Sequence, residues 1–173
     1  GSRSQNGSAE QIIVGSRSAA MVTRGHGLAD DRIVTPGPRQ PLTFGSFTLT
    51  LIPSGHVRPD RFDGQVRAPL SPPAPVSAYR AGDCYSLHVQ HPRCDVLVQG
   101  SAGVVPGALQ GVRAPVVCLA VGGLGRRPQA EFDTYWREVV TTVGGRRVLV
   151  THWDDITLPL LWGGLAVAAL GGT

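Results

Sequence analysis

The last third of the sequence alternates between strand-like and helix-like segments, and this pattern restricts the possible folds most strongly. Val116–Val121 is an apolar run that ends at Gly122-Gly123, which predicts a buried strand. Apolar residues then recur at helical spacing: Phe132, Trp136, Val139, Val140 and Val143. Gly144-Gly145 ends this helix, and Arg147–Thr151 predicts the next strand. A strand–helix–strand unit of this kind pairs its strands in parallel, and we expect Trp136 to be buried against the sheet.

Before this unit, the sequence predicts short elements joined by turns. Ser16 is placed to cap a brief helix that stops near Gly25. Leu42–Phe44 and Phe47–Ile52 flank Gly45-Ser46, which predicts a β-hairpin. The chain is therefore expected to be a mixed α/β fold, with hairpins first and a βαβ unit last.

A second hairpin is predicted over Tyr79–Gln90, with its turn at Gly82-Asp83. Within it, His88 alternates with apolar residues, so we expect its side chain on a solvated face. The next strand, Asp95–Gln99, stops at Gly100-Ser101.

Two of the predicted strands run into histidines. The hairpin strand that ends at Ile52 is followed by Pro53-Ser54-Gly55-His56, and Arg147–Thr151 is followed by His152-Trp153-Asp154-Asp155. Chemistry often occurs where a strand ends, because the backbone there is rigid and the side chain meets solvent. A proline-rich stretch without periodicity follows His56, and a loop of that length is usually functional or mobile.

Composition narrows the class of protein. The chain has 173 residues, of which 42% are hydrophobic and 16% charged, so it has the material for a folded core. Its basic residues are all arginine, the net charge of +4 is mild and the arginines are scattered, so no nucleic-acid partner is expected. The apolar tail Leu158–Leu170 contains Pro159 and is too short to span a bilayer. The absence of a visible signal peptide favours a cytoplasmic location.

We expect one domain over residues 11–173, preceded by a cloning remnant or disordered leader over residues 1–10. Four stretches of this domain resemble the metallo-β-lactamase-fold hydrolases. They are FGSFTLTLIPSGH, YSLHVQHPRCDVLVQGSAG, APVVCLAVGGLG and VLVTHWDD. The resemblance runs from about Ile12 to Pro159 and corresponds to the later part of such a domain. It implies a partial αββα sandwich, from the branch that ends in His-Trp-Asp-Asp.

In the family that the chain resembles, metal ligands come from strand ends. The resemblance implies metal ligands at His56 and His152, with Ser101 where the family has a bridging aspartate. It makes His152 and Asp154 the candidate catalytic residues. Zinc is the expected metal, with iron or manganese as alternatives, and a site left unoccupied is also open. The implied reaction is attack by metal-activated water on an ester, amide or phosphodiester bond of a small molecule.

The sequence departs from the family pattern in two ways. The signature His-x-His-x-Asp-His is absent, so the chain is expected to lack a complete active site and to need a second copy or a complementing N-terminal segment. Ser101 is neutral and binds hard cations weakly. Gly82-Asp83 imitates the bridging turn but precedes a strand, so Asp83 is expected to lie away from the site.

Two other readings stay open at this point. Ser101, Asp133 and His152 follow the chain order of a serine hydrolase, although Gln99 interrupts the G-x-S-x-G motif. In the second reading, the chain is a non-catalytic partial domain. The metal reading requires His56 and His152 to approach each other within about 10 Å, because metal–nitrogen bonds are about 2 Å long.

Overall fold

The computed structural model describes residues 11–58, 60 and 62–153. Asp154, Asp155 and the apolar tail Leu158–Leu170 lie outside the described residues. The chain divides into two compact units, Gly1–Pro36 with Phe62–Asp83 and Gly37–Arg61 with Cys84–Thr173. No helix within the described ranges has both the length and the apolar character that crossing a bilayer requires.

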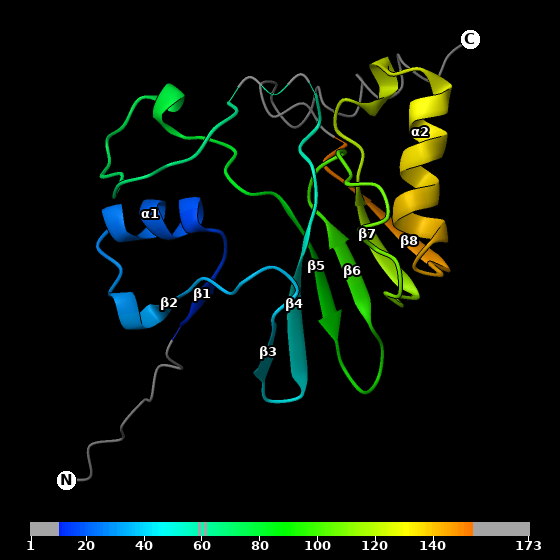
Figure 1. Ribbon diagram of the computed structural model, residues 1–173, viewed down its shortest axis with the longest axis horizontal. Helices are drawn as coiled ribbons and strands as arrows, with labels where there is room; N and C mark the ends of the chain where they lie inside the picture. The colour runs from blue at the N-terminus through cyan, green and yellow to red at the C-terminus, as the bar shows by residue number, and fades with distance from the viewer. Residues whose placement is uncertain (1–10, 59, 61, 154–173) are drawn as a thin grey trace, which may run out of the picture. The chain divides into compact units, whose positions relative to one another are not determined.

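The first unit contains one regular helix and several short elements (Figure 1). They are β1 (Ile13–Val14), α1 (Arg17–Gly25), η1 (Asp30–Arg32), β2 (Ile33–Val34) and η2 (Val76–Ala78). β1 and β2 pair in parallel. Helix α1 is capped as predicted, because Ser16 Oγ accepts a hydrogen bond from Ala19 N at 3.2 Å. Gly25 ends this helix at a point where a Cβ would collide with the backbone of Leu70, so only glycine fits.

The second unit is built on a six-stranded sheet with the order β3-β4-β5-β6-β7-β8. Its strands and helices are β3 (Pro41–Phe44), β4 (Phe47–Pro53), β5 (Tyr85–Gln90), β6 (Val96–Gln99), β7 (Val116–Ala120), η3 (Leu124–Arg126), α2 (Gln129–Trp136), the π-helical η4 (Arg137–Thr141) and β8 (Arg147–Thr151). Neighbouring strands are antiparallel from β3 to β6 and parallel from β6 to β8. The predicted mixed α/β class is confirmed, as is the order of hairpins first and βαβ unit last.

The prediction of a second hairpin over Tyr79–Gln90 is wrong, because β5 does not pair with the residues just before it. β5 pairs with β4 on one side and β6 on the other, and residues 79–83 form no strand. Their backbone instead bonds within the first unit, where Ala81 N and Gly82 N donate to Phe62 O and Gly64 O. The true turn joins β5 to β6, and Asp95 Oδ1 stabilises it by accepting from His91 N at 3.2 Å.

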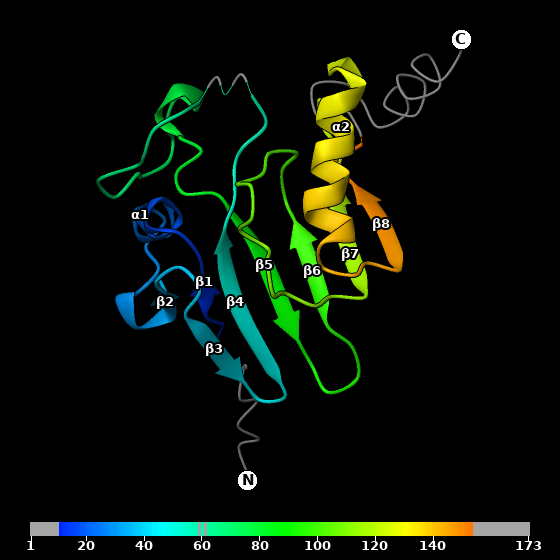
Figure 2. The same cartoon turned by 45° about the vertical axis from the view of Figure 1, so that its right-hand side comes forward.

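One face of the sheet carries the hydrophobic core, and α2 lies over its β7–β8 side (Figure 2). Leu97, Val117 and Leu119 project from β6 and β7 and are at most 1% exposed. They belong to one cluster with Val139 and Val143 from the helical segment. This burial of apolar surface is the main stabilising contribution to the βαβ unit.

The prediction that Trp136 is buried at the centre of this helix is wrong. Trp136 is 38% exposed and packs beside Phe132, with ring centroids 6.1 Å apart. Tyr135 is the buried aromatic residue, at 2% exposure. Its ring shares a face with Val139 and Val143 at spacings of four residues, and its hydroxyl finds a backbone acceptor at Ala120 O.

The prediction that His88 lies on a solvated face is also wrong. His88 is 8% exposed and lies in register with Leu97, on the face that the core covers. Its Nε2 is 3.0 Å from Arg113 O and 3.6 Å from Asp95 Oδ2. The loop before β7 therefore covers β5 with a backbone carbonyl, which is a suitable partner for an imidazole N–H.

Strand β8 is one of the two outer strands of the described sheet and pairs with β7. Leu149 and Val150 on this strand are 49% and 54% exposed. An outer strand with apolar side chains on both faces is a favourable place for association with another chain.

Candidate functional site

The strand directions bring the predicted site residues to one edge of the second unit. β4, β6, β7 and β8 all run the same way, because β4 and β6 are both antiparallel to β5 while β6, β7 and β8 are parallel. Their carboxyl ends lead into His56, Ser101, Gly122 and His152 respectively. This is the edge at which open α/β sheets usually bind their ligands.

The loops after β4 and β6 contact each other directly. Ser101 Oγ accepts a hydrogen bond from Val57 N at 3.0 Å. Gly103 lies so close to the backbone of Gly55 and His56 that a Cβ at this position would collide with His56 O. The loop that carries Ser101 is therefore fixed against the loop that carries His56.

The glycine pair after β7 contacts the residues that follow both β4 and β8. A Cβ on Gly122 would lie 2.7 Å from His152 Cδ2 and 2.8 Å from Nε2, so the imidazole packs over this glycine. A Cβ on Gly123 would lie 3.3 Å from Val57 Cγ2. Val57 and His152 thus flank two adjacent residues at the same edge.

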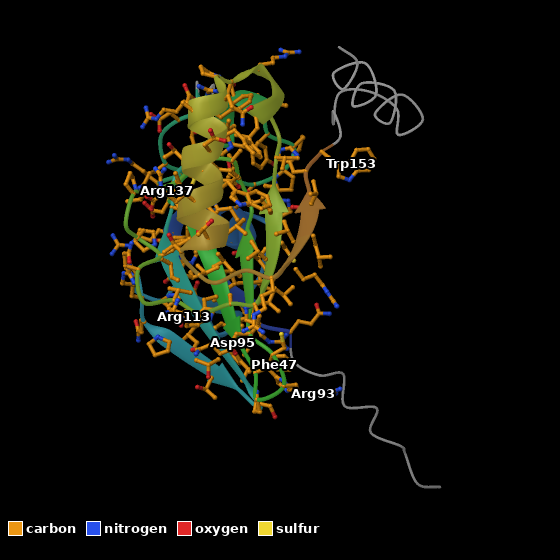
Figure 3. All side chains as sticks on the ribbon, turned by 90° about the vertical axis from the view of Figure 1, so that its right-hand side faces the viewer. Phe47, Arg93, Asp95, Arg113, Arg137 and Trp153 are labelled. Atoms are coloured by element: carbon orange, nitrogen blue, oxygen red, sulfur yellow. The ribbon has the colours of Figure 1, made fainter. Side chains whose placement is uncertain are left out.

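His152 has an unusual backbone conformation for a residue with a side chain, since its φ is 50°. A left-handed conformation of this kind costs about 1–2 kcal/mol for a non-glycine residue. His152 and Trp153 are exposed, and Trp153 projects away from the sheet (Figure 3). The chain therefore turns sharply at the end of β8 and presents an imidazole and an indole to solvent.

A buried amide ties the loops of this edge together. Gln99, the last residue of β6, is 1% exposed. Its Nε2 donates to Ser101 O at 2.8 Å and Gly103 O at 2.7 Å, and lies 3.0 Å from Ser54 Oγ. Its Oε1 accepts from Ser86 Oγ. In the sequence, Gln99 is visible only as a break in the G-x-S-x-G motif, and the amide at the end of this buried strand is the signal of the polar network.

Tyr135 connects α2 to the same edge. Its hydroxyl donates to Ala120 O at 2.8 Å and lies 3.3 Å from Ser101 O. Burial raises the pKa of the Tyr135 phenol above its ordinary value. The hydroxyl therefore keeps its proton and remains a hydrogen-bond donor at neutral pH.

His56 has a carboxylate partner four residues later in the chain. Its Nδ1 lies 3.1 Å from Asp60 Oδ2. The His56 side chain is 41% exposed, whereas the Asp60 side chain is 14% exposed. The pair therefore joins a partly exposed imidazole to a more buried carboxylate.

Other candidate residues have local partners. Asp83 belongs to the first unit, where its Oδ1 accepts from Gln65 Nε2 at 2.9 Å. Asp133 lies on α2 and accepts from Gln129 Nε2 at 2.8 Å. Within residues 11–58, 60 and 62–153, no group of three or more His, Cys, Asp or Glu side chains is placed to hold a metal ion.

Comparisons with known proteins gave a structural likeness. No family model matches the chain, and no curated protein matches it. The chain is similar to the crystal structure of the metallo-beta-lactamase fold protein YhfI from Bacillus subtilis, with 16% sequence identity and a TM-score of 0.47. The likeness covers 82% of this chain and 51% of that one, so the chain spans about half the length of that protein.

Proposed function

We propose that this chain is the later part of a metallo-β-lactamase-like domain and that it belongs to a metal-dependent hydrolase. His56 and His152 are the proposed metal ligands. The supporting observation is the direction of the strands, because β4 and β8 end at the same edge and the loops after β4, β6 and β7 contact one another there. Solvent-reaching imidazoles at such an edge suit zinc, and also iron or manganese.

A bound metal would supply an activated water that attacks an ester, amide or phosphodiester bond. The chain's own residues form the edge of the sheet at which this metal would bind. The Ser101 hydroxyl links the two loops by accepting from Val57 N, and it is the proposed third ligand and the oxygen donor of the set. Asp154 is the proposed acid–base residue beside His152.

The ligand count predicts weak metal binding. A catalytic zinc site usually has three protein ligands and one water. The proposed set contains two imidazoles and one neutral hydroxyl, and the hydroxyl already accepts a backbone hydrogen bond. We therefore propose that additional ligands come from a second copy of the chain or from a complementing N-terminal segment.

Zinc calorimetry tests this function. We expect weak binding to one site, at least tenfold weaker still in His152→Ala and in His56→Ala. His26→Ala is the matched control, because His26 lies in the first unit and its Nδ1 is 2.9 Å from Val22 O. Equal losses in all three variants, or no loss in any, would contradict the proposal. Chromogenic lactone, thioester and phosphodiester substrates, assayed with added zinc, then identify the reaction class.

The second candidate function is a non-catalytic partial domain. The use of the Ser101 hydroxyl to join two loops favours it, because that is a structural role. A fluorophosphonate probe and the zinc measurements separate the candidates. A serine hydrolase would be labelled at Ser101, a metal-dependent hydrolase would bind zinc through His56 and His152, and a non-catalytic domain would do neither.

A further inference from the structure

His56 and Asp60 form a close pair in the loop that follows β4. The Asp60 carboxylate is largely buried, at 14% side-chain exposure, and its Oδ2 is 3.1 Å from His56 Nδ1. A carboxylate oxygen only accepts, so a hydrogen on His56 Nδ1 would make this contact favourable.

A neutral imidazole has a single N–H, so a hydrogen on Nδ1 leaves the lone pair on Nε2. We propose that Asp60 is a positioning residue that holds His56 in the Nδ1–H tautomer and presents Nε2 to a divalent metal ion. This inference rests on the proposed function. An imidazole without such a partner favours the Nε2–H tautomer, in which the nitrogen at the tip of the ring is blocked from coordination.

A second histidine–aspartate pair in the same unit has the opposite arrangement. His88 uses Nε2 toward both Arg113 O, at 3.0 Å, and Asp95 Oδ2, at 3.6 Å. A carbonyl oxygen only accepts, so His88 must carry its hydrogen on Nε2. His88 is also 8% exposed. The two pairs therefore differ in the nitrogen that carries the hydrogen and in access to solvent. His88 serves as an internal reference for the tautomer of His56.

Nitrogen-15 NMR of the imidazole rings tests the inference on the metal-free protein, at a pH where the histidines are neutral. We expect the Nδ1–H pattern for His56 and the Nε2–H pattern for His88. Asp60→Ala should convert His56 to the Nε2–H form and leave His88 unchanged. Asp60→Asn should preserve the Nδ1–H form, because the amide oxygen still accepts. Asp63→Ala is the matched control, since Asp63 Oδ1 accepts from its neighbour Gly64 N.

An Nε2–H pattern for His56 in the wild-type chain would overturn the inference, as would a pattern that Asp60→Ala leaves unchanged. Zinc added to the same samples tests the proposed function separately. We expect zinc to shift His56 Nε2, with an affinity 10- to 100-fold weaker in Asp60→Ala than in the wild-type chain. If the tautomer is as proposed but zinc leaves His56 unshifted, the ligand role of His56 and the proposed function fail, while the assignment of the tautomer to Asp60 stands.

Discussion

Gln99 is predicted to stabilise the candidate site and the fold together. Methionine has a similar shape, so Gln99→Met removes the hydrogen bonds while leaving little empty space. The amide lies within hydrogen-bonding distance of Ser101 O, Gly103 O, Ser54 Oγ and Ser86 Oγ. Since Nε2 has two hydrogens, the side chain makes about three full bonds at once, two as a donor and one as an acceptor. At about 1 kcal/mol for each bond, we expect Gln99→Met to lower the free energy of unfolding by about 3 kcal/mol.

Urea denaturation followed by circular dichroism measures this loss, and thermal unfolding provides a second reading. A loss of about 3 kcal/mol corresponds to a fall of about 6–12 °C in Tm for a chain of this size. Gln90→Met is the matched control, because Gln90 is the exposed last residue of β5. If the two variants agree within about 0.5 kcal/mol, the range of ordinary surface substitutions, the network does not hold the edge together.

Three further perturbations follow from the structure. Burial raises the pKa of Tyr135 above its ordinary value of 10.0, so the unfolded chain loses this proton first and stability should fall as the pH rises above about 10. Thermal unfolding at about pH 9 and about pH 11 should show a smaller fall for Tyr135→Phe, and an equal fall would contradict the assignment. Ser101→Asp replaces a neutral donor by a carboxylate that can still accept from Val57 N, so zinc affinity measured by calorimetry should rise at least tenfold; an unchanged affinity would remove Ser101 from the site. Light scattering should show the wild-type chain above monomer mass and Val150→Arg closer to it, because Val150 is 54% exposed on the outer strand, and a monomeric wild-type chain would contradict this.

The sequence was sufficient to predict the βαβ unit and the residues at which its strands end. The run Val116–Val121 is apolar without interruption and stops at a glycine pair. Its short length, its valines and the flanking glycines favour a buried strand over a helix, and β7 occupies Val116–Ala120. Parallel pairing of β7 and β8 follows from the handedness of the connection. The edge that carries Ser101 and His152 is therefore a consequence of local pattern and general topology.

The rotation of the helix could not be predicted from its apolar residues. Tyr135 and Trp136 are adjacent aromatic residues, and either could begin the buried stripe. Tyr135 is buried because its hydroxyl reaches Ala120 O, an acceptor at the end of a strand 15 residues earlier. The identity of that acceptor depends on tertiary structure and leaves no trace in helical spacing.

The polar partners within the second unit were unpredictable for the same reason. His88 is buried because Arg113 O comes from a loop 25 residues later in the chain. Gln99 bonds Ser54, which lies 45 residues away. The pairing of His56 with Asp60 is local, at a spacing of four residues, but the intervening loop has no periodicity from which to infer it.

The central claim is that His56 and His152 share one metal ion, and pulsed electron paramagnetic resonance of bound copper tests it most directly. Copper(II) binds sites of this donor type at least as tightly as zinc, and the modulation of its signal counts the coordinated imidazoles. We predict two imidazoles per copper in the wild-type chain, one in His56→Ala, one in His152→Ala and two in the control His26→Ala. One imidazole in the wild-type chain, or a count that falls in the control instead, would contradict a shared site.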